Sequence, residues 1–117
     1  MSRFLLLLRD DPSTFAHLSP AEMQAIIQKY IAWGNGLRAS GRLITSDKLT
    51  GEGGRVARRG DGKPMVTDGP FTEAREVVGG FYMIHAKNYD DAMTVVNECP
   101  HLAFGSIEVR QVEELER

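Results

Sequence analysis

The chain has 117 residues, of which 42% are hydrophobic and 26% are charged, and its net charge is -2. This length fits a single domain, predicted over residues 1–117. The charge offers no basic face for nucleic acid, and the longest apolar run, FLLLL at residues 4–8, is too short for a membrane span or a signal-peptide core. The single cysteine, Cys99, excludes an internal disulfide and fits a reducing cytoplasm. We therefore expect a cytoplasmic protein without nucleic-acid or membrane partners.

The first half of the chain predicts a strand, a long helix and a second strand. Residues 3–9 are apolar on both alternating faces, which is typical of a strand covered on both sides. Ser19, Pro20 and Glu22 have the spacing of a capping box, and apolar residues then recur every three or four positions as far as Leu37. Gly41 is the expected end of this helix, and a strand is expected over residues 43–49.

The second half predicts a hairpin, a strand, a helix and a last strand. The turn GDGK joins short strands at residues 55–59 and 64–67. Residues 80–86 form an expected strand with two apolar faces, residues 90–99 a helix that Pro100 ends, and residues 106–112 the last strand. Gly79 and Gly80 lead into a strand rather than a helix, so they predict close backbone packing and not a phosphate loop.

The order β-α-β-β-β-β-α-β predicts an α+β fold, the ferredoxin-like plan with an inserted hairpin. Two helices cover only one face of such a sheet. Because the strands at residues 3–9 and 80–86 are apolar on both faces, we expect a second copy to cover the other face and give a homodimer.

The segment TDGPFTEAREVVGGFY resembles the signature of the DGPF subgroup of the YCII-related proteins. The matching residues are Asp68-Gly69-Pro70-Phe71, Glu73, Arg75-Glu76 and Gly79-Gly80-Phe81-Tyr82. The opening MSRFLLLLRDD, the helix entry LSPAEM and the closing ECPHLAFGSIEVRQV also match. Arg75 and Gln111 are mild departures, since relatives more often have lysine and proline there.

The resemblance implies a dimeric α+β barrel and a largely uncharacterised activity. Family members have been proposed as enzymes, with a His–Asp pair in the YciI-like branch, and no clearly corresponding pair is identified in this sequence. An association of DGPF domains with sigma factors implies a regulatory role instead.

Asp68 is the candidate catalytic residue, and two interpretations of it stay open. It can accept backbone N–H groups in the turn at Gly69-Pro70, or it can act as a general base or bind a ligand. Phe71, Glu73 and Arg75 are candidate ligand-binding residues beside it. A solvated short helix with an ion pair accounts for Glu73 and Arg75 equally well.

Tyr30 and His101 complete the candidate ligand-binding residues. Tyr30 lies on the apolar face of the long helix, either as core or with its hydroxyl in a cavity. His101 follows Cys99 by two residues, so the pair is either a nucleophile with its base or a buried cysteine beside a surface histidine. The spacing of the three histidines does not suit zinc, and we expect no metal and no cofactor.

Two hypotheses about function follow. In the first, the protein binds a small polar molecule in a barrel pocket near the DGPF segment, with or without an enzymatic activity on it. In the second, it is a non-catalytic regulatory module linked to sigma-factor-dependent transcription. Such a module would contact a protein through its dimer surface or through the hairpin with Arg55, Arg58 and Arg59.

Overall fold

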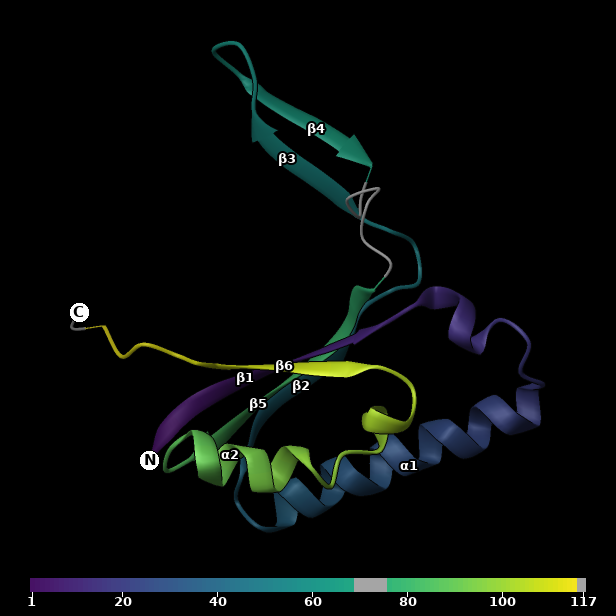
Figure 1. The fold of residues 1–117 in the computed structure, drawn as a ribbon, viewed down its shortest axis with the longest axis vertical. Coiled ribbons are helices and arrows are strands. Elements are labelled where there is room, and N and C mark those ends of the chain that lie inside the picture. Colours follow the sequence, from purple (N-terminus) through teal and green to yellow (C-terminus); the bar gives the residue numbers. More distant parts are fainter. Residues whose placement is uncertain (69–75, 116–117) are drawn as a thin grey trace.

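The computed structural model of the chain describes residues 1–68 and 76–115 (Figure 1). The elements are β1 (Ser2–Asp10), the 3₁₀ helix η1 (Pro12–Phe15), α1 (Pro20–Ala39), β2 (Leu43–Lys48), β3 (Arg55–Arg59), β4 (Pro64–Asp68), β5 (Val77–Ala86), α2 (Tyr89–Val96), the 3₁₀ helix η2 (Pro100–Ala103) and β6 (Ser106–Gln111). The predicted order of strands and α-helices is confirmed.

Four strands form an antiparallel sheet in the order β2-β5-β1-β6. Without the hairpin β3–β4, which pairs only within itself, this is the ferredoxin-like arrangement that the sequence predicts. The capping box at Ser19 and Glu22 forms as predicted, and Gly41 follows α1 with a φ of 76°, a conformation that favours glycine.

Some element boundaries differ from the prediction. β5 begins at Val77 rather than Gly80, because Val77 and Val78 pair with the end of β1 beyond a bulge. α2 ends at Val96, and Cys99 is extended because the residue before a proline disfavours the helical conformation. The chain therefore turns at Pro100 into η2, an element that the sequence pattern did not indicate.

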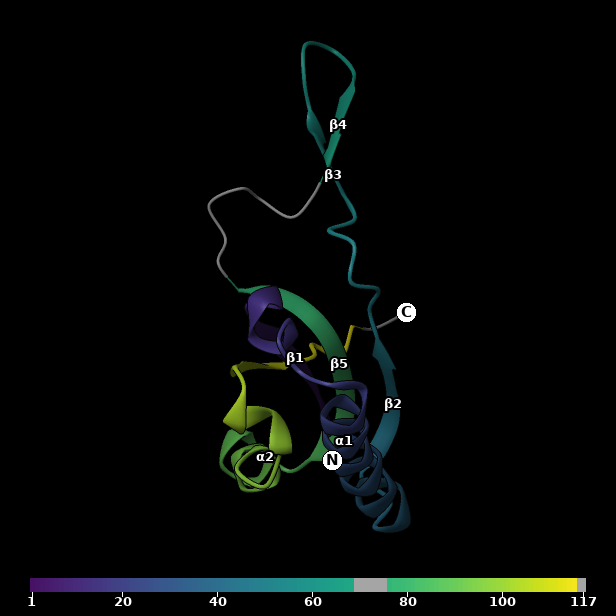
Figure 2. The same ribbon diagram turned by 90° about the vertical axis from the view of Figure 1, so that its right-hand side faces the viewer.

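The core lies between the helices and one face of the sheet (Figure 2). Its buried members are Phe4, Leu6, Leu8, Leu37, Ile84, Ala86, Ala92 and Val96. Between them along the strands lie Leu5, Leu7, Phe81 and Met83, which point to the opposite side and are partly exposed. We call this side the open face; in it, Leu5 pairs with Met83 and Leu7 with Phe81.

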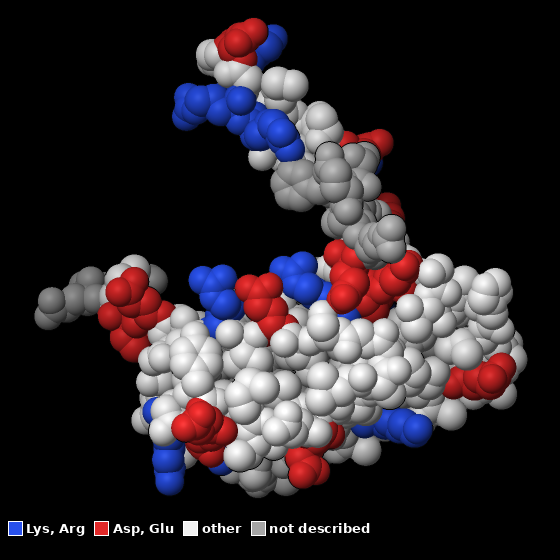
Figure 3. Space-filling view, viewed as in Figure 1, with Lys and Arg blue, Asp and Glu red and all other residues white. Residues whose placement is uncertain are grey.

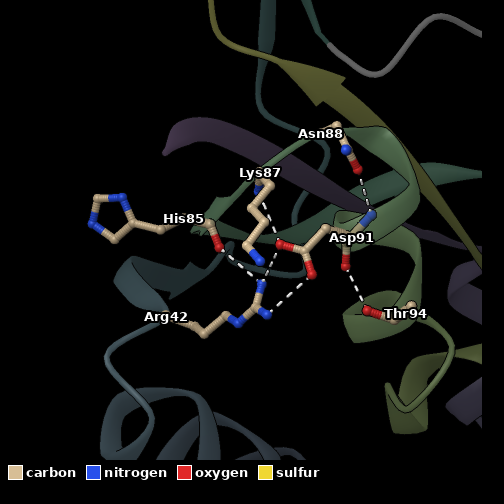
Figure 4. Close-up of polar contacts among 6 residues, drawn as sticks. All are labelled: Arg42, His85, Lys87, Asn88, Asp91 and Thr94. Carbon is tan, nitrogen blue, oxygen red and sulfur yellow. Dashed lines mark hydrogen bonds and ion pairs between the residues drawn. The ribbon is translucent and has the colours of Figure 1, made fainter.

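A polar cluster fixes α2 to the sheet (Figure 4). Both guanidinium Nη atoms of Arg42 donate to the carboxylate of Asp91, at 3.0 and 3.1 Å. The same carboxylate accepts from the backbone N–H of Lys87, while Asn88 caps the helix by accepting from the N–H of Asp91. One carboxylate thus joins the start of β2, the end of β5 and the first turn of α2.

Candidate functional site

A cleft of about 480 Å³ lies between α1 and one end of the sheet. Most of its wall is apolar, since α1, η1 and β1 contribute aliphatic and aromatic side chains. Polar side chains lie in the same cleft. The residues that line it are Leu8, Asp10, Phe15, Met23, Ile26, Ile27, Tyr30, Ile31, Gly34, Asn35, Arg38, Ser46, Asp47, Lys48, Gly79, Gly80, Tyr82 and His101.

His101 is the buried centre of a hydrogen-bonded chain at this cleft. The residue lies in η2 and is 2% exposed. Its Nε2 is 2.8 Å from the backbone carbonyl oxygen of Arg9, and its Nδ1 is 2.8 Å from the hydroxyl of Tyr30. A carbonyl oxygen only accepts, so Nε2 carries the proton. In the neutral imidazole Nδ1 then accepts, and the Tyr30 hydroxyl donates to it.

The environment of Tyr30 keeps its hydroxyl protonated. Burial raises the pKa of this phenol well above its usual range, and the nearby Cys99, Asp10 and Tyr82 raise it further. A protonated phenol is the state that can donate to Nδ1 of His101. The pKa and the hydrogen-bond geometry therefore agree on one arrangement of protons: Tyr30 donates to His101, which donates to the carbonyl of Arg9.

Asp10 brings a carboxylate to the same histidine. Its Oδ2 lies 4.0 Å from Nε2 of His101, which is too far for a hydrogen bond but places a negative charge beside the ring. A Cβ on Gly79 would lie 3.1 Å from this oxygen, and a Cβ on Gly105 would overlap the carbonyl of Arg9. Glycine at both positions lets the backbone approach the two polar groups.

The prediction of close backbone packing at Gly79 and Gly80 is confirmed. Gly80 is buried, and a Cβ there would lie 3.1 Å from the backbone oxygen of Asp47 on the neighbouring strand β2. These glycines let β2 and the end of β1 approach β5, which forms one side of the cleft.

Neither predicted alternative for the pair of Cys99 and His101 holds in full. Cys99 is buried, as one alternative had it, and burial raises the pKa of its thiol to about 11, so it is not an activated nucleophile. The accompanying interpretation of His101 as a surface residue is wrong. The turn at Pro100 directs its ring inward, between α1 and the end of β1.

The structure separates the predicted site residues into two groups. Tyr30 and His101 meet in the cleft. Asp68 ends β4 on the hairpin, where its side chain is 90% exposed and its Oδ1 lies 3.3 Å from Nε of Arg55. Asp68 is not among the residues that line the cleft in the single chain. Phe71, Glu73 and Arg75 lie outside the described residues, so their role stays a prediction.

Asp10 is the site residue that sequence reasoning missed. It stands 91 positions before His101, and the pairing of β1 with β6 brings the end of β1 near η2. The signal available in the sequence was a charged pair, Asp10-Asp11, directly after a strand that is apolar on both faces.

Within residues 1–68 and 76–115 there is no group of three or more histidine, cysteine, aspartate or glutamate side chains that could hold a metal ion. In the same part of the chain, neither α-helix combines the length and the apolar character needed to cross a membrane.

Comparison with known proteins assigns the family. The model of the YCII-related domain matches residues 2–116. The chain belongs to the YCII-related domain family. An uncharacterised protein of Rhizobium meliloti (strain 1021), R00369, is 30% identical over 91 residues, which are 76% of this chain and 68% of the relative.

A solved structure shares the fold of this family member. It is a 5-chloro-2-hydroxyhydroquinone dehydrochlorinase from Burkholderia phenoliruptrix AC1100 in complex with 2,5-dihydroxybenzoquinone. The likeness covers 95% of this chain and 93% of that chain, with a TM-score of 0.50 and 17% sequence identity. At this identity the likeness concerns the fold, and it agrees with the mixed α+β architecture described above.

Proposed function

We propose that this protein binds a small, largely apolar molecule with an ionisable hydroxyl group in the cleft and moves a proton on it. The observation that carries the proposal is the chain from Tyr30 through His101 to the carbonyl of Arg9. Both hydrogen bonds are 2.8 Å long, and the histidine between them is buried. A buried titratable group with fixed partners, beside a cleft, is the usual setting of acid–base chemistry.

The proton path follows from the orientation of the chain. A ligand hydroxyl donates its proton to the oxygen of Tyr30, while the phenolic proton passes to Nδ1 of His101. The ligand becomes an anion and the histidine a cation, so charge is conserved. The carboxylate of Asp10, 4.0 Å from Nε2, stabilises that cation, and the carbonyl of Arg9 holds the ring in place. Tyr30 is thus the group that touches the ligand, and His101 is the base behind it.

The composition of the cleft indicates the class of ligand. Its wall carries Phe15, Ile26 and Ile27, among other apolar side chains, which suit a ring or short hydrocarbon frame. Its polar groups suit a hydroxyl. The structural neighbour binds 2,5-dihydroxybenzoquinone, a molecule of this kind, which supports the proposal by analogy of fold.

The test uses a panel of small hydroxylated aromatic and quinone compounds, with 2,5-dihydroxybenzoquinone included. Binding is followed by thermal shift. Loss of the hydroxyl proton gives an enolate that takes up protons at carbon, so exchange of carbon-bound hydrogen for deuterium is followed by NMR in D₂O. We expect at least one compound to bind and to exchange faster with the wild-type protein than with His101→Gln or Tyr30→Phe. Tyr89→Phe is the matched control, because Tyr89 is not among the cleft residues and its hydroxyl accepts from the backbone N–H of Gln111.

Equal exchange in Tyr30→Phe and Tyr89→Phe would remove the tyrosine from the proton path. Absence of binding and exchange across the panel would instead favour the regulatory module linked to sigma factors. Membership of the DGPF subgroup, which implies that role, stays a prediction.

We also propose that the protein is a homodimer joined through the open face. Leu5, Leu7, Phe81 and Met83 form a contiguous apolar patch on the side of the sheet opposite the helices. Such a patch in the middle of a sheet favours a partner surface, and closed two-fold pairing is the commonest arrangement. A single species at the monomer mass in sedimentation at micromolar concentration would contradict it.

A further inference from the structure

The hairpin formed by β3 and β4, residues 55–68, stands away from the rest of the molecule; we call it the arm (Figures 1 and 2). It is a separate two-stranded sheet. All residues of its two strands are exposed to solvent except Val56, which is half-buried. A two-stranded hairpin with so little burial is marginally stable in water by itself.

The dimensions of the chain reflect the arm. A compact domain of this length has a radius of gyration of about 13 Å. The value here is 16.4 Å, and the molecule measures 49 × 48 × 19 Å. The single chain therefore exposes more surface than a domain of its size needs, and the excess lies in the arm.

Besides the backbone pairing of its two strands, the arm has polar contacts at its base and in its turn. Asp68 pairs with Arg55 at the base, the Thr67 hydroxyl donates to the carbonyl of Val56 at 3.4 Å, and the N–H of Gly60 donates to the carbonyl of Lys63 in the turn. None of these contacts buries apolar area. The arm therefore lacks a hydrophobic core of its own.

One face of the arm is apolar in its middle. The pairing of Ala57 with Val66 and of Arg59 with Pro64 places these four side chains on one side of the hairpin. Val66 is 64% exposed, more than any other large apolar side chain of the arm. The opposite side carries Val56 and Thr67, with Arg58 and Met65 toward the turn, and its large apolar side chains are more covered than Val66.

The arm and the open face border the same hollow. In Figure 1 the helices lie below the sheet and the arm rises on the other side, so the open face is turned toward the space beside the arm. In Figure 3 the basic side chains of the arm gather on its side toward this hollow, and acidic and basic side chains alternate along the opposite edge.

The charges of the two parts are of opposite sign. Residues 55–68 contain four Lys or Arg and two Asp, which gives +2, so the rest of the chain, with ten basic and fourteen acidic residues, has -4. A basic arm is thus attracted to the body of another copy of the same chain.

We propose that the arm of each copy packs, through Ala57, Pro64 and Val66, against the body of a second copy seated on the open face. This inference rests on the homodimer proposed above and adds a second contact surface to it. In a two-fold dimer the contact occurs twice, so each body is held between its partner's open face and its partner's arm.

The size of the open face agrees with a need for additional contact area. Four strands about 4.8 Å apart, each about six residues long at about 3.3 Å per residue, have a projected area of roughly 400 Å². Stable homodimers bury on the order of 1,000 Å² or more per copy. The arms add area on both sides of the interface.

The experiment compares two arm variants of the full chain that add the same charge one residue apart. Val66→Asp alters the apolar face, and Thr67→Asp alters the opposite face. The dimer dissociation constant is measured by sedimentation. We expect Val66→Asp to raise it about tenfold or more and Thr67→Asp to change it less than about threefold, because a buried carboxylate loses its hydration and an exposed one does not.

Hydrogen exchange of the arm provides the second measurement. The backbone amides of β3 and β4 should exchange at least about tenfold more slowly in the wild-type dimer than in Val66→Asp at a concentration where that variant is a monomer. A wild-type dimer whose arm exchanges as fast as the monomer's, or equal effects of the two substitutions, would overturn the arm contact and leave the open-face dimer standing. A monomeric wild-type protein would overturn both. Ligand binding in the cleft is measured separately, so each result is attributed to its own proposal.

Discussion

The cleft and the base of the arm each hold a carboxylate close to a nitrogen-containing side chain. The surroundings of the two pairs differ. Asp10 and His101 lie among packed elements, with the histidine bonded at both ring nitrogens. Asp68 and Arg55 form an ion pair whose side chains are 90% and 65% exposed. Water screens the second pair and competes with it, whereas the first pair is held in one geometry. Packing therefore holds Asp10 and His101 in one arrangement, while the pair of Asp68 and Arg55 is open to water.

The largest loss of stability is expected when the buried imidazole ring of His101 is removed. His101→Ala leaves the carbonyl of Arg9 and the hydroxyl of Tyr30 without their partner and opens a cavity, at a cost of about 3 kcal/mol in the free energy of unfolding. Urea unfolding measures it. The matched control is His17→Ala at an exposed position, which should change stability by less than about 0.5 kcal/mol. Equal stability of the two variants would show that the buried network is not formed.

A smaller loss of stability is expected when Gly105 is replaced by alanine. Its control, Gly36→Ala, should change stability in the opposite direction. Gly105→Ala places a methyl group against the carbonyl of Arg9 and 3.0 Å from Nε2 of His101, and we expect a loss of about 2 kcal/mol. Gly36→Ala, within α1, meets nothing within 4 Å and should stabilise the protein by about 0.5–1 kcal/mol, since alanine favours the helix. Thermal unfolding of both variants checks the prediction, which fails if their effects have the same sign.

The stability of the body should fall in acid, and Asp91 should account for part of the fall. Its hydrogen bond to the guanidinium of Arg42, followed by that to the N–H of Lys87, holds the pKa of this carboxyl below its usual range. The stabilisation is therefore present above the unfolded value, about 4, and is lost as the pH falls through the lower folded value. In urea titrations between pH 6 and pH 3, Asp91→Asn should be less stable at pH 6 and lose less on acidification.

Asp90→Asn is the control for that titration, since it removes the same charge from an exposed position one residue away. It should keep the wild-type dependence on pH. Glu108, held mainly by Arg9, and Glu114, held mainly by Arg3, also have lowered pKa values, as does Glu22 through its bond to the backbone N–H of Ser19. These three carboxyl groups contribute to the slope that remains. An Asp91→Asn protein with the full wild-type slope would contradict the role given to Asp91.

The sequence predicted the fold well because its signals are local. The capping box at Ser19, the turn at Asp61-Gly62 and the alternation of apolar residues each depend on neighbours within a few positions. The strand and helix order then restricts the topology to few arrangements, and the sheet order β2-β5-β1-β6 is one of them.

The candidate site was predicted only in part, because it depends on contacts far apart in the chain. Tyr30 and His101 were named separately, and their hydrogen bond joins residues 71 positions apart. Asp10 was missed for the same reason. The inward turn of His101 depends on Pro100, whose effect on the direction of the next side chain has no periodic signature. The prominent polar motif at Asp68 lies on the arm, away from this cleft.

The smallest change in stability is expected for substitutions of Asp68. It tests most directly whether the exposed ion pair of the arm contributes less than the buried network of the cleft. Because its pair with Arg55 is exposed, Asp68→Asn and Asp68→Ala should each change the free energy of unfolding by less than about 0.5 kcal/mol. If the carboxylate instead ties the turn through backbone N–H groups, alanine should cost about 1–3 kcal/mol and asparagine should recover much of it. Melting curves of the two variants distinguish these cases.

Ligand binding by the same variants decides whether Asp68 belongs to the site. Since Asp68 does not line the cleft of its own chain, we expect Asp68→Asn to bind any compound found by the panel with wild-type affinity. Calorimetric titration measures this, with Tyr30→Phe as the variant expected to bind more weakly. A well-folded Asp68→Asn protein that fails to bind would mean that the carboxylate reaches a ligand from outside its own cleft. In the proposed dimer, the arm of the partner subunit is the candidate for this contact, and the arm would then be part of the site as well as of the interface.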